Sequence, residues 1–127
     1  MVPWDVIRKF LLETCSAEEK NEHFFVSVRC PNDRLQTVCV YVVDSSKIVL
    51  ESPFAKASEQ ASVLVPLLPL LAKVSHYGVR QDGDYLVLTN TGVLGGLTPP
   101  ELDYLMNDLA AKADEIEDLL TEGEDSF

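Results

Sequence analysis

Residues 23–50 read HFFVSVRCPNDRLQTVCVYVVDSSKIVL and carry the patterns that decide the fold. Apolar and polar residues alternate in two runs, and the turn-forming residues 31–33 separate the runs. The alternating apolar residues are Phe24, Val26, Val28, Val38, Val40 and Val42. These six share one face in a single register only, because a slip by one residue would turn half of them to the other face. The stretch therefore predicts two antiparallel strands with one apolar face.

A third strand is expected after the turn residues 44–46. Ile48 and Leu50 continue the apolar face of the first two strands. We expect Pro53 to end this strand, because proline cannot donate a hydrogen bond to a neighbouring strand.

A further hairpin is expected within residues 76–92, where Asp82-Gly83 is the strongest hairpin signal in the chain. A two-residue turn at this pair would place Val79 opposite Leu86 and Tyr77 opposite Leu88. These four apolar residues would then share a face, so the pattern and the turn agree.

Helical spacing of apolar residues predicts a helix at each end of the chain. The first follows Pro3 and ends near Thr14. The last begins with Thr98 as its cap and Glu101 three residues later, which together form a capping box. The expected buried stripe of the last helix is Leu102, Leu105, Met106, Leu109, Ala113, Ile116 and Leu120.

A middle helix is predicted over residues 57–74, which are rich in Leu and Val. Pro66 and Pro69 fall inside it, and an interior proline costs about 3 kcal/mol or more. Either the regular helix starts near Pro66, or it is kinked there. The element order is thus α-β-β-β-α-β-β-α, which predicts an α+β fold with an antiparallel sheet packed against helices. We expect residues 1–120 to form one domain and residues 121–127 an acidic flexible tail.

Charge is distributed unevenly along the 127 residues. The formal net charge is −11, and from Glu101 onward ten acidic residues face one lysine, a net of −9. Because phosphate binding depends on clustered Lys and Arg, this balance argues against nucleic acid and against an anionic membrane surface. Three cysteines without a CxxC pair, and no secretory signal, predict a soluble cytoplasmic protein with reduced thiols.

Nucleophilic catalysis would need a cysteine or serine with a base in reach. The histidines are His23 and His76, and pairing either with Cys39 would require a coincidence of the fold. The five Cys and His residues lack the spacing of a zinc site. We therefore expect no catalytic residues, no metal and no cofactor.

The acidic residues Asp114, Glu115, Glu117 and Asp118 oppose the dipole of the last helix, at a cost of about 0.3–1 kcal/mol. They form either a solvated face that keeps the protein soluble or an acidic arm that docks a basic segment. A second candidate surface is the sheet face opposite the apolar one. It carries Phe25, Cys39, Tyr41 and Val49, and suits a peptide unless a dimer partner or the last helix covers it.

The element order, the stretch VLESPFA (49–55) and the ending LTPPELDYLMNDLAAKADEIEDLL (97–120) resemble the bacterial YbjN-like family, which shares the fold of type III secretion chaperones. The resemblance implies no reaction and a compact homodimer. Partner segments are expected to wrap over the sheet and the first helix, which adds Trp4, Ile7 and Phe10 to the partner-binding residues. The implied dimer residues on the middle helix are Val63, Leu64, Leu67, Leu68 and Leu71.

The sequence thus predicts a non-enzymatic module with a protein-binding or regulatory role. Its expected partner is a protein or peptide, and a basic segment is one candidate. The alternatives are a structural subunit whose acidic tail provides solubility and, third, a small enzyme. A pocket with convergent polar groups would favour the enzyme.

Overall fold

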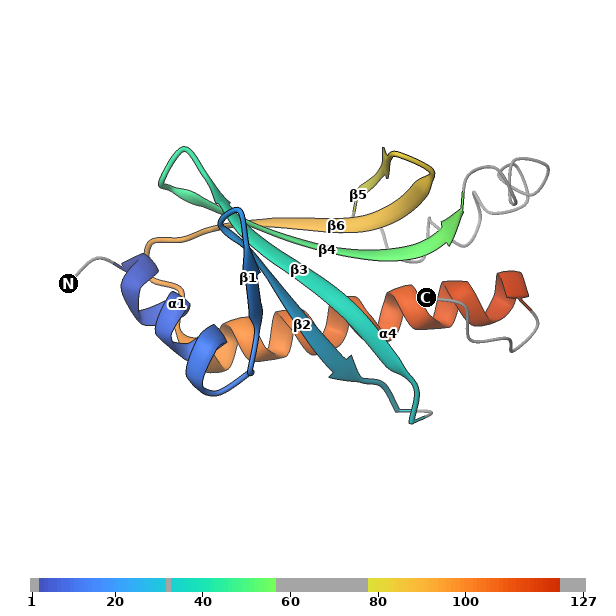
Figure 1. Cartoon of the computed structure of the whole chain (residues 1–127), viewed down its shortest axis with the longest axis horizontal. Coiled ribbons are helices and arrows are strands. Elements are labelled where there is room, and N and C mark those ends of the chain that lie inside the picture. Colours follow the sequence, from blue (N-terminus) through green and yellow to red (C-terminus); the bar gives the residue numbers. More distant parts are fainter. Residues whose placement is uncertain (1–2, 32, 57–77, 122–127) are drawn as a thin grey trace.

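A computed structural model describes residues 3–31, 33–56 and 78–121 of the chain. Its elements are α1 (Pro3–Glu13), β1 (Glu18–Lys20), β2 (His23–Arg29), β3 (Leu35–Val43), β4 (Lys47–Lys56), β5 (Gly78–Asp82), β6 (Tyr85–Val93) and α4 (Pro99–Thr121). The six strands form one antiparallel sheet in the order β1-β2-β3-β4-β6-β5. The long helix α4 runs along one side of the sheet, and α1 lies beside the beginning of α4 (Figure 1). The predicted α+β class is confirmed.

The predicted register of the first two long strands is confirmed. Phe24 lies opposite Val40, and Val26 lies opposite Val38. These four side chains are buried and belong to one core cluster with residues of α4. The alternation therefore sets the register, because any other pairing would expose part of this apolar set.

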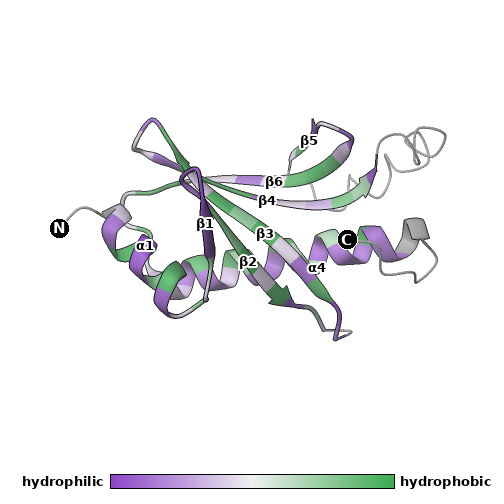
Figure 2. Cartoon of the chain, viewed as in Figure 1, coloured by the Kyte–Doolittle hydropathy of each residue, from purple (hydrophilic) through white to green (hydrophobic). Residues whose placement is uncertain are grey.

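The strand β1 was not predicted from the sequence. Its three residues, Glu18–Lys20, are all charged and exposed, and β1 is uniformly hydrophilic in Figure 2. Backbone pairing with β2 holds the strand, with Lys20 opposite His23. An ion pair between Glu19 and Arg8 of α1 (3.0 Å) adds to this pairing. The strand has no apolar alternation that could reveal it in the sequence. Its shortness and charge suit an edge, because they discourage pairing with another chain.

The prediction that Pro53 ends the third strand is wrong. β4 continues to Lys56, and its register against β6 shifts between Pro53 and Ala55. A bulge tolerates proline because the ladder is interrupted there anyway. The extension places Phe54 in the core, where it is fully buried.

The predicted hairpin exists, but its turn is displaced. The central residues are Gly83 and Asp84, since Asp82 lies opposite Tyr85. Val79 therefore faces Leu88 and not Leu86. Gly83 has φ 60°, as the first central residue of a type II′ turn requires. The apolar residues still share one face as predicted. The shift moves each cross-strand partner by two residues, and side chains two residues apart in a strand point to the same face. Tyr77 lies outside the described residues.

The final helix begins as predicted. The Glu101 amide donates to Thr98 Oγ1 (3.4 Å), and the Thr98 hydroxyl donates to Glu101 Oε1 (3.1 Å). The buried residues of its stripe are Leu102, Met106, Leu109, Ala113 and Ile116, with Leu105 half-buried. The side chain of Leu120, like the middle helix predicted over 57–74, lies outside the described residues.

We predict that Phe54→Ala lowers the free energy of unfolding by about 3–5 kcal/mol, because it opens a cavity beneath the extended strand. The matched control is Val93→Ala, since Val93 is 73% exposed on the neighbouring strand. The control should change stability by no more than about 0.5 kcal/mol. Urea unfolding followed by circular dichroism measures both. A loss below 1 kcal/mol for Phe54→Ala would contradict the placement of residues beyond Pro53 in the core.

Candidate peptide-binding face of the sheet

The two faces of the sheet are covered unequally. Both described helices pack on the same side, where α4 contacts β2, β3, β4 and β6, and where Trp4 of α1 packs on Phe24. We call the opposite side the open face. None of the described helices packs on it. Among the described residues, seven large apolar side chains are exposed. The open face carries five of them, namely Phe25, Leu35, Val43, Tyr85 and Val93.

A hollow of about 250 Å³ lies in the open face. It spans strands β2 to β5 and is lined by His23, Phe25, Thr37, Cys39, Glu51, Pro53, Arg80, Asp82, Tyr85 and Val87. The two predicted residues Phe25 and Cys39 are thus brought together here. Aromatic and aliphatic side chains surround a few polar groups, which is the usual composition of a binding pocket.

Glu51 and Arg80 form the polar centre of the hollow. Arg80 Nε and Nη2 donate to the two carboxylate oxygens of Glu51, with a distance of 2.6 Å between Nη2 and Oε1. Arg80 belongs to the edge strand β5 and reaches over β6 to Glu51 on β4. The side chain of Glu51 is 6% exposed and that of Arg80 is 43% exposed. The hydrogen bonds to Glu51 raise the pKa of Arg80, so its guanidinium stays protonated and positively charged.

Because Ile48 and Leu50 belong to the apolar face, strand alternation puts Glu51 on the opposite face, but the sequence does not indicate its partner Arg80. The available signal was an acidic residue in the middle of an apolar strand, since a charged residue is almost never buried unless it is paired. No spacing rule points from Glu51 to Arg80, because 29 residues separate them.

Tyr41 and His23 continue the row of interacting side chains that begins with Arg80 and Glu51. Burial, then the charge of Glu51 and a hydrogen bond with Glu51, raise the pKa of Tyr41. The ring of His23 lies against that of Tyr41, with 4.5 Å between centroids and 35° between planes. Its Nδ1 donates to the carbonyl of Asn21 (2.9 Å). Side chains from four strands, β2 to β5, are therefore linked across the open face.

Cys39 lines the same hollow as His23, so the coincidence that a Cys–His pair requires is partly met. Burial, reinforced by the charge of Glu51, raises the pKa of the Cys39 thiol to about 11. An activated nucleophile needs a lowered pKa. The thiol is therefore protonated at neutral pH and acts as an apolar side chain of the hollow.

The other predicted partner-binding residues are divided between the two sides of the molecule. Val49 lies on the open face, where its neighbours bury it. Trp4 and Phe10 are half-buried against the core on the helix side. Ile7 is fully buried in that core, so its assignment to a binding surface is wrong. The same apolar spacing that predicted helix α1 places Ile7 at the centre of its buried face.

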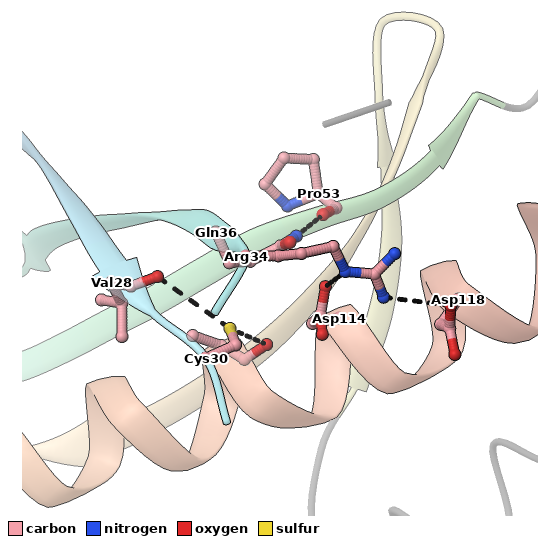
Figure 3. Close-up of polar contacts among 8 residues, drawn as sticks. Val28, Cys30, Arg34, Gln36, Pro53, Asp114 and Asp118 are labelled. Carbon is pink, nitrogen blue, oxygen red and sulfur yellow. Dashed lines mark hydrogen bonds and ion pairs between the residues drawn. The ribbon is translucent and has the colours of Figure 1, made fainter. Parts of the chain in front are cut away.

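The predicted acidic arm is not a single exposed surface. Asp114 and Glu117 are buried, whereas Glu115 and Asp118 are exposed. Arg34, from the connection between β2 and β3, pairs through Nε with Asp114 Oδ1 (3.1 Å) and through Nη2 with Asp118 Oδ1 (3.2 Å) (Figure 3). The helical period turns part of the acidic run toward the sheet. The ion pairs of Asp114 and Asp118 with Arg34 therefore hold α4 against the rest of the domain.

The remaining predicted sites lie elsewhere. Val63, Leu64, Leu67, Leu68 and Leu71, the predicted dimer residues, lie outside the described residues. Within residues 3–31, 33–56 and 78–121, no three or more Cys, His, Asp or Glu residues are grouped so as to hold a metal ion. No helix in this part of the chain has both the length and the apolar character needed to span a membrane.

Comparison with known proteins supports the fold alone. No known protein family and no curated protein sequence matches the chain. A structure of the Yersinia pestis type III secretion chaperone SycH, in complex with a stable fragment of YscM2, matches with a TM-score of 0.62 and 15% identity, covering 90% of this chain and 98% of that one. An uncharacterised protein from Methanothermobacter thermautotrophicus matches with a TM-score of 0.61 and 13% identity, covering 94% and 97% of the two chains.

The chain therefore has the fold of a type III secretion chaperone, as the sequence predicted. Membership of the YbjN-like family stays a prediction.

We predict that iodoacetamide alkylates Cys39 much more slowly than free cysteine at pH 8. With a pKa of about 11 against about 8.5 for an ordinary thiol, Cys39 carries about two hundredfold less thiolate at that pH. The rate should rise with pH up to about 11, and Glu51→Gln should increase it at pH 8 because one cause of the raised pKa is removed. Mass spectrometry of the Cys39 peptide measures the rate. A rate that levels off below pH 9 would contradict this environment.

Proposed function

We propose that the protein is a non-enzymatic binding module that holds a segment of a partner polypeptide on the open face of its sheet. The observation that carries the proposal is the concentration of exposed apolar side chains on the face that neither described helix covers. Of these side chains, Phe25 and Tyr85 line the hollow, and apolar walls around a few polar groups are typical of a binding pocket. The presence of arginine and tyrosine in the hollow supports the same function, because these residues are enriched where binding energy is concentrated.

The fold supports a protein partner in particular. The matching SycH structure is that of a chaperone in complex with a fragment of another protein, YscM2. We infer by analogy that the present chain also binds a polypeptide. The identity between the chains is 15%, so the analogy extends to the kind of partner and not to its name.

Binding is favoured over catalysis by the chemistry of the hollow. The one thiol there is protonated at neutral pH, and Arg80 neutralises the buried carboxylate. A general base must be able to accept a proton near neutral pH. Glu51 accepts hydrogen bonds from Arg80 and Tyr41, which occupy its oxygens. The group is therefore arranged to hold the face together and not to transfer protons.

We predict that Phe25→Asp abolishes co-purification of the partner from an extract of the native cells while the domain stays folded. Phe25 is 38% exposed, so the charge can remain in water in the free protein but cannot be desolvated against a bound segment. The matched control is Tyr104→Asp, at a residue of α4 that is 68% exposed on the other side of the molecule. Circular dichroism checks the folding of both variants.

Two results would contradict the function. If Phe25→Asp unfolds the protein, the open face is part of the core. If Phe25→Asp and Tyr104→Asp capture the same proteins as the wild type, partners do not use this face. Capture that is lost in Phe25→Asp and retained in Tyr104→Asp supports the proposal.

We further propose that the chain acts as a homodimer in the cytoplasm, with Val63, Leu64, Leu67, Leu68 and Leu71 at the interface. The expected molar mass by light scattering is about twice 14.1 kDa, and Leu67→Asp should halve it. A monomeric wild type at all concentrations would contradict the dimer. A dimer that Phe25→Asp dissociates would instead make the open face the dimer interface.

A further inference from the structure

We infer that Arg80, held in place by Glu51, is the anchor of the open face, and that it selects an uncharged extended polypeptide by donating a hydrogen bond to a main-chain carbonyl. The inference rests on the proposed function and specifies the chemistry of the partner segment. It follows from the geometry of the guanidinium, the charge of the face and the shape of the hollow.

The guanidinium of Arg80 is fixed, and one side of it remains available. Glu51 accepts hydrogen bonds from Nε and Nη2, and Asp82 Oδ2 lies 3.8 Å from Nη2. Within the part of the chain that the structure describes, Nη1 makes no hydrogen bond. A donor fork that is already oriented loses little conformational entropy when it binds. Arg80 is therefore prepared to donate through Nη1 to an acceptor above the hollow.

The charge of the open face differs from that of the whole chain. On this face the strands carry the basic residues Lys20, Arg29, Lys47, Lys56 and Arg80, and the acidic residues Glu18, Glu51 and Asp82. Five bases and three acids give a net charge of +2, whereas the chain carries −11. This face is thus where an uncharged apolar segment can approach without crossing a strong field.

The immediate surroundings of Arg80 disfavour a charged ligand. Glu51 already neutralises the guanidinium, and Asp82 lies beside it, so a partner carboxylate would approach two like charges. A partner ammonium group would instead have to approach the guanidinium. A main-chain carbonyl carries no net charge and needs only a donor. The geometry therefore favours an uncharged segment over the basic one that the charge of the whole chain suggested.

The walls of the hollow provide the apolar half of the recognition. Phe25, Cys39, Tyr85 and Val87 surround the pair, and about 250 Å³ accommodates one large apolar side chain. In an extended segment alternate side chains point to the same side, and the carbonyls between them stay accessible. One aromatic or branched side chain can therefore fill the hollow while a neighbouring carbonyl accepts from Arg80.

The test uses three acetylated and amidated hexapeptides with the full-length protein. The first is Thr-Val-Phe-Thr-Val-Thr, and the other two replace both valines by lysine or by glutamate. Titration followed by ¹⁵N NMR, including the Arg80 side-chain signal, measures binding. We expect the uncharged peptide to bind saturably, with shifts at Phe25 and Arg80. We expect it to bind at least about tenfold more tightly than either charged peptide, because a charged side chain in place of valine must be desolvated beside the charges of Arg80, Glu51 and Asp82.

Two variants test whether binding depends on the guanidinium of Arg80 itself or only on its positive charge. Because Arg80→Gln alone leaves Glu51 buried without a partner, the main variant is the pair Glu51→Gln and Arg80→Gln, which removes both charges. Arg80→Lys keeps the charge but lacks the fork. We expect both to weaken binding of the uncharged peptide about tenfold or more. The control Lys47→Gln, a charge change on the same face outside the hollow, should leave the affinity unchanged.

Three results would overturn the inference. They are no saturable shift on the open face with the uncharged peptide at millimolar concentration, equal affinity for the charged and uncharged peptides, and unchanged affinity in both Arg80 variants. Failure of the anchor is distinguishable from failure of the proposed function. If Phe25→Asp loses partner capture from the extract while the Glu51→Gln and Arg80→Gln pair retains it fully, the protein binds partners on this face without the anchor.

Discussion

The packing of α4 against one side of the sheet is the constraint on which the rest of the structure depends. Its apolar stripe, together with Ile7 and Leu11 of α1, buries the even-numbered residues of β2 and β3. A helix can cover only one face of a sheet, and both described helices lie on the same side. The apolar residues of the opposite face, such as Phe25 and Tyr85, therefore stay at the surface of the described domain. The same division of faces creates the core and the candidate binding surface.

Glu51 shows how the open face is stabilised internally. Burying an unpaired carboxylate in a central strand lowers the stability of the fold by about 1–3 kcal/mol or more. Charged or polar partners are needed to offset this cost. Arg80 supplies two hydrogen bonds and Tyr41 a third. Because Arg80 comes from the edge strand, the same interaction ties β5 to β4 across β6. Burial and, second to it, the charge of Glu51 raise the pKa of Cys39 and make the thiol a poor nucleophile. The same carboxylate organises the hollow, so binding is better supported than catalysis.

The elements that were predicted correctly have a strong local pattern, and those that were missed do not. The register of β2 and β3 follows from alternating apolar residues, and the start of α4 follows from Thr98 and its capping box. β1 consists of charged residues without apolar alternation, and contacts with other elements hold it, namely backbone pairing with β2 and the ion pair of Glu19 with Arg8. Pro53 was interpreted as the end of a strand because proline interrupts a ladder, but a bulge provides a position where no ladder bond is needed.

The sequence by itself determined strands β2 and β3 and their register, the capped start of α4 and the stripe that packs on the sheet, because periods of 2 and 3.6 residues depend only on local backbone geometry. Only the tertiary structure decided that Asp114 turns inward to Arg34, that Arg80 reaches Glu51, and that one face of the sheet stays uncovered by the described helices. These are contacts between residues far apart in the chain. Their partners are chosen by how the elements pack, and no local spacing encodes that choice.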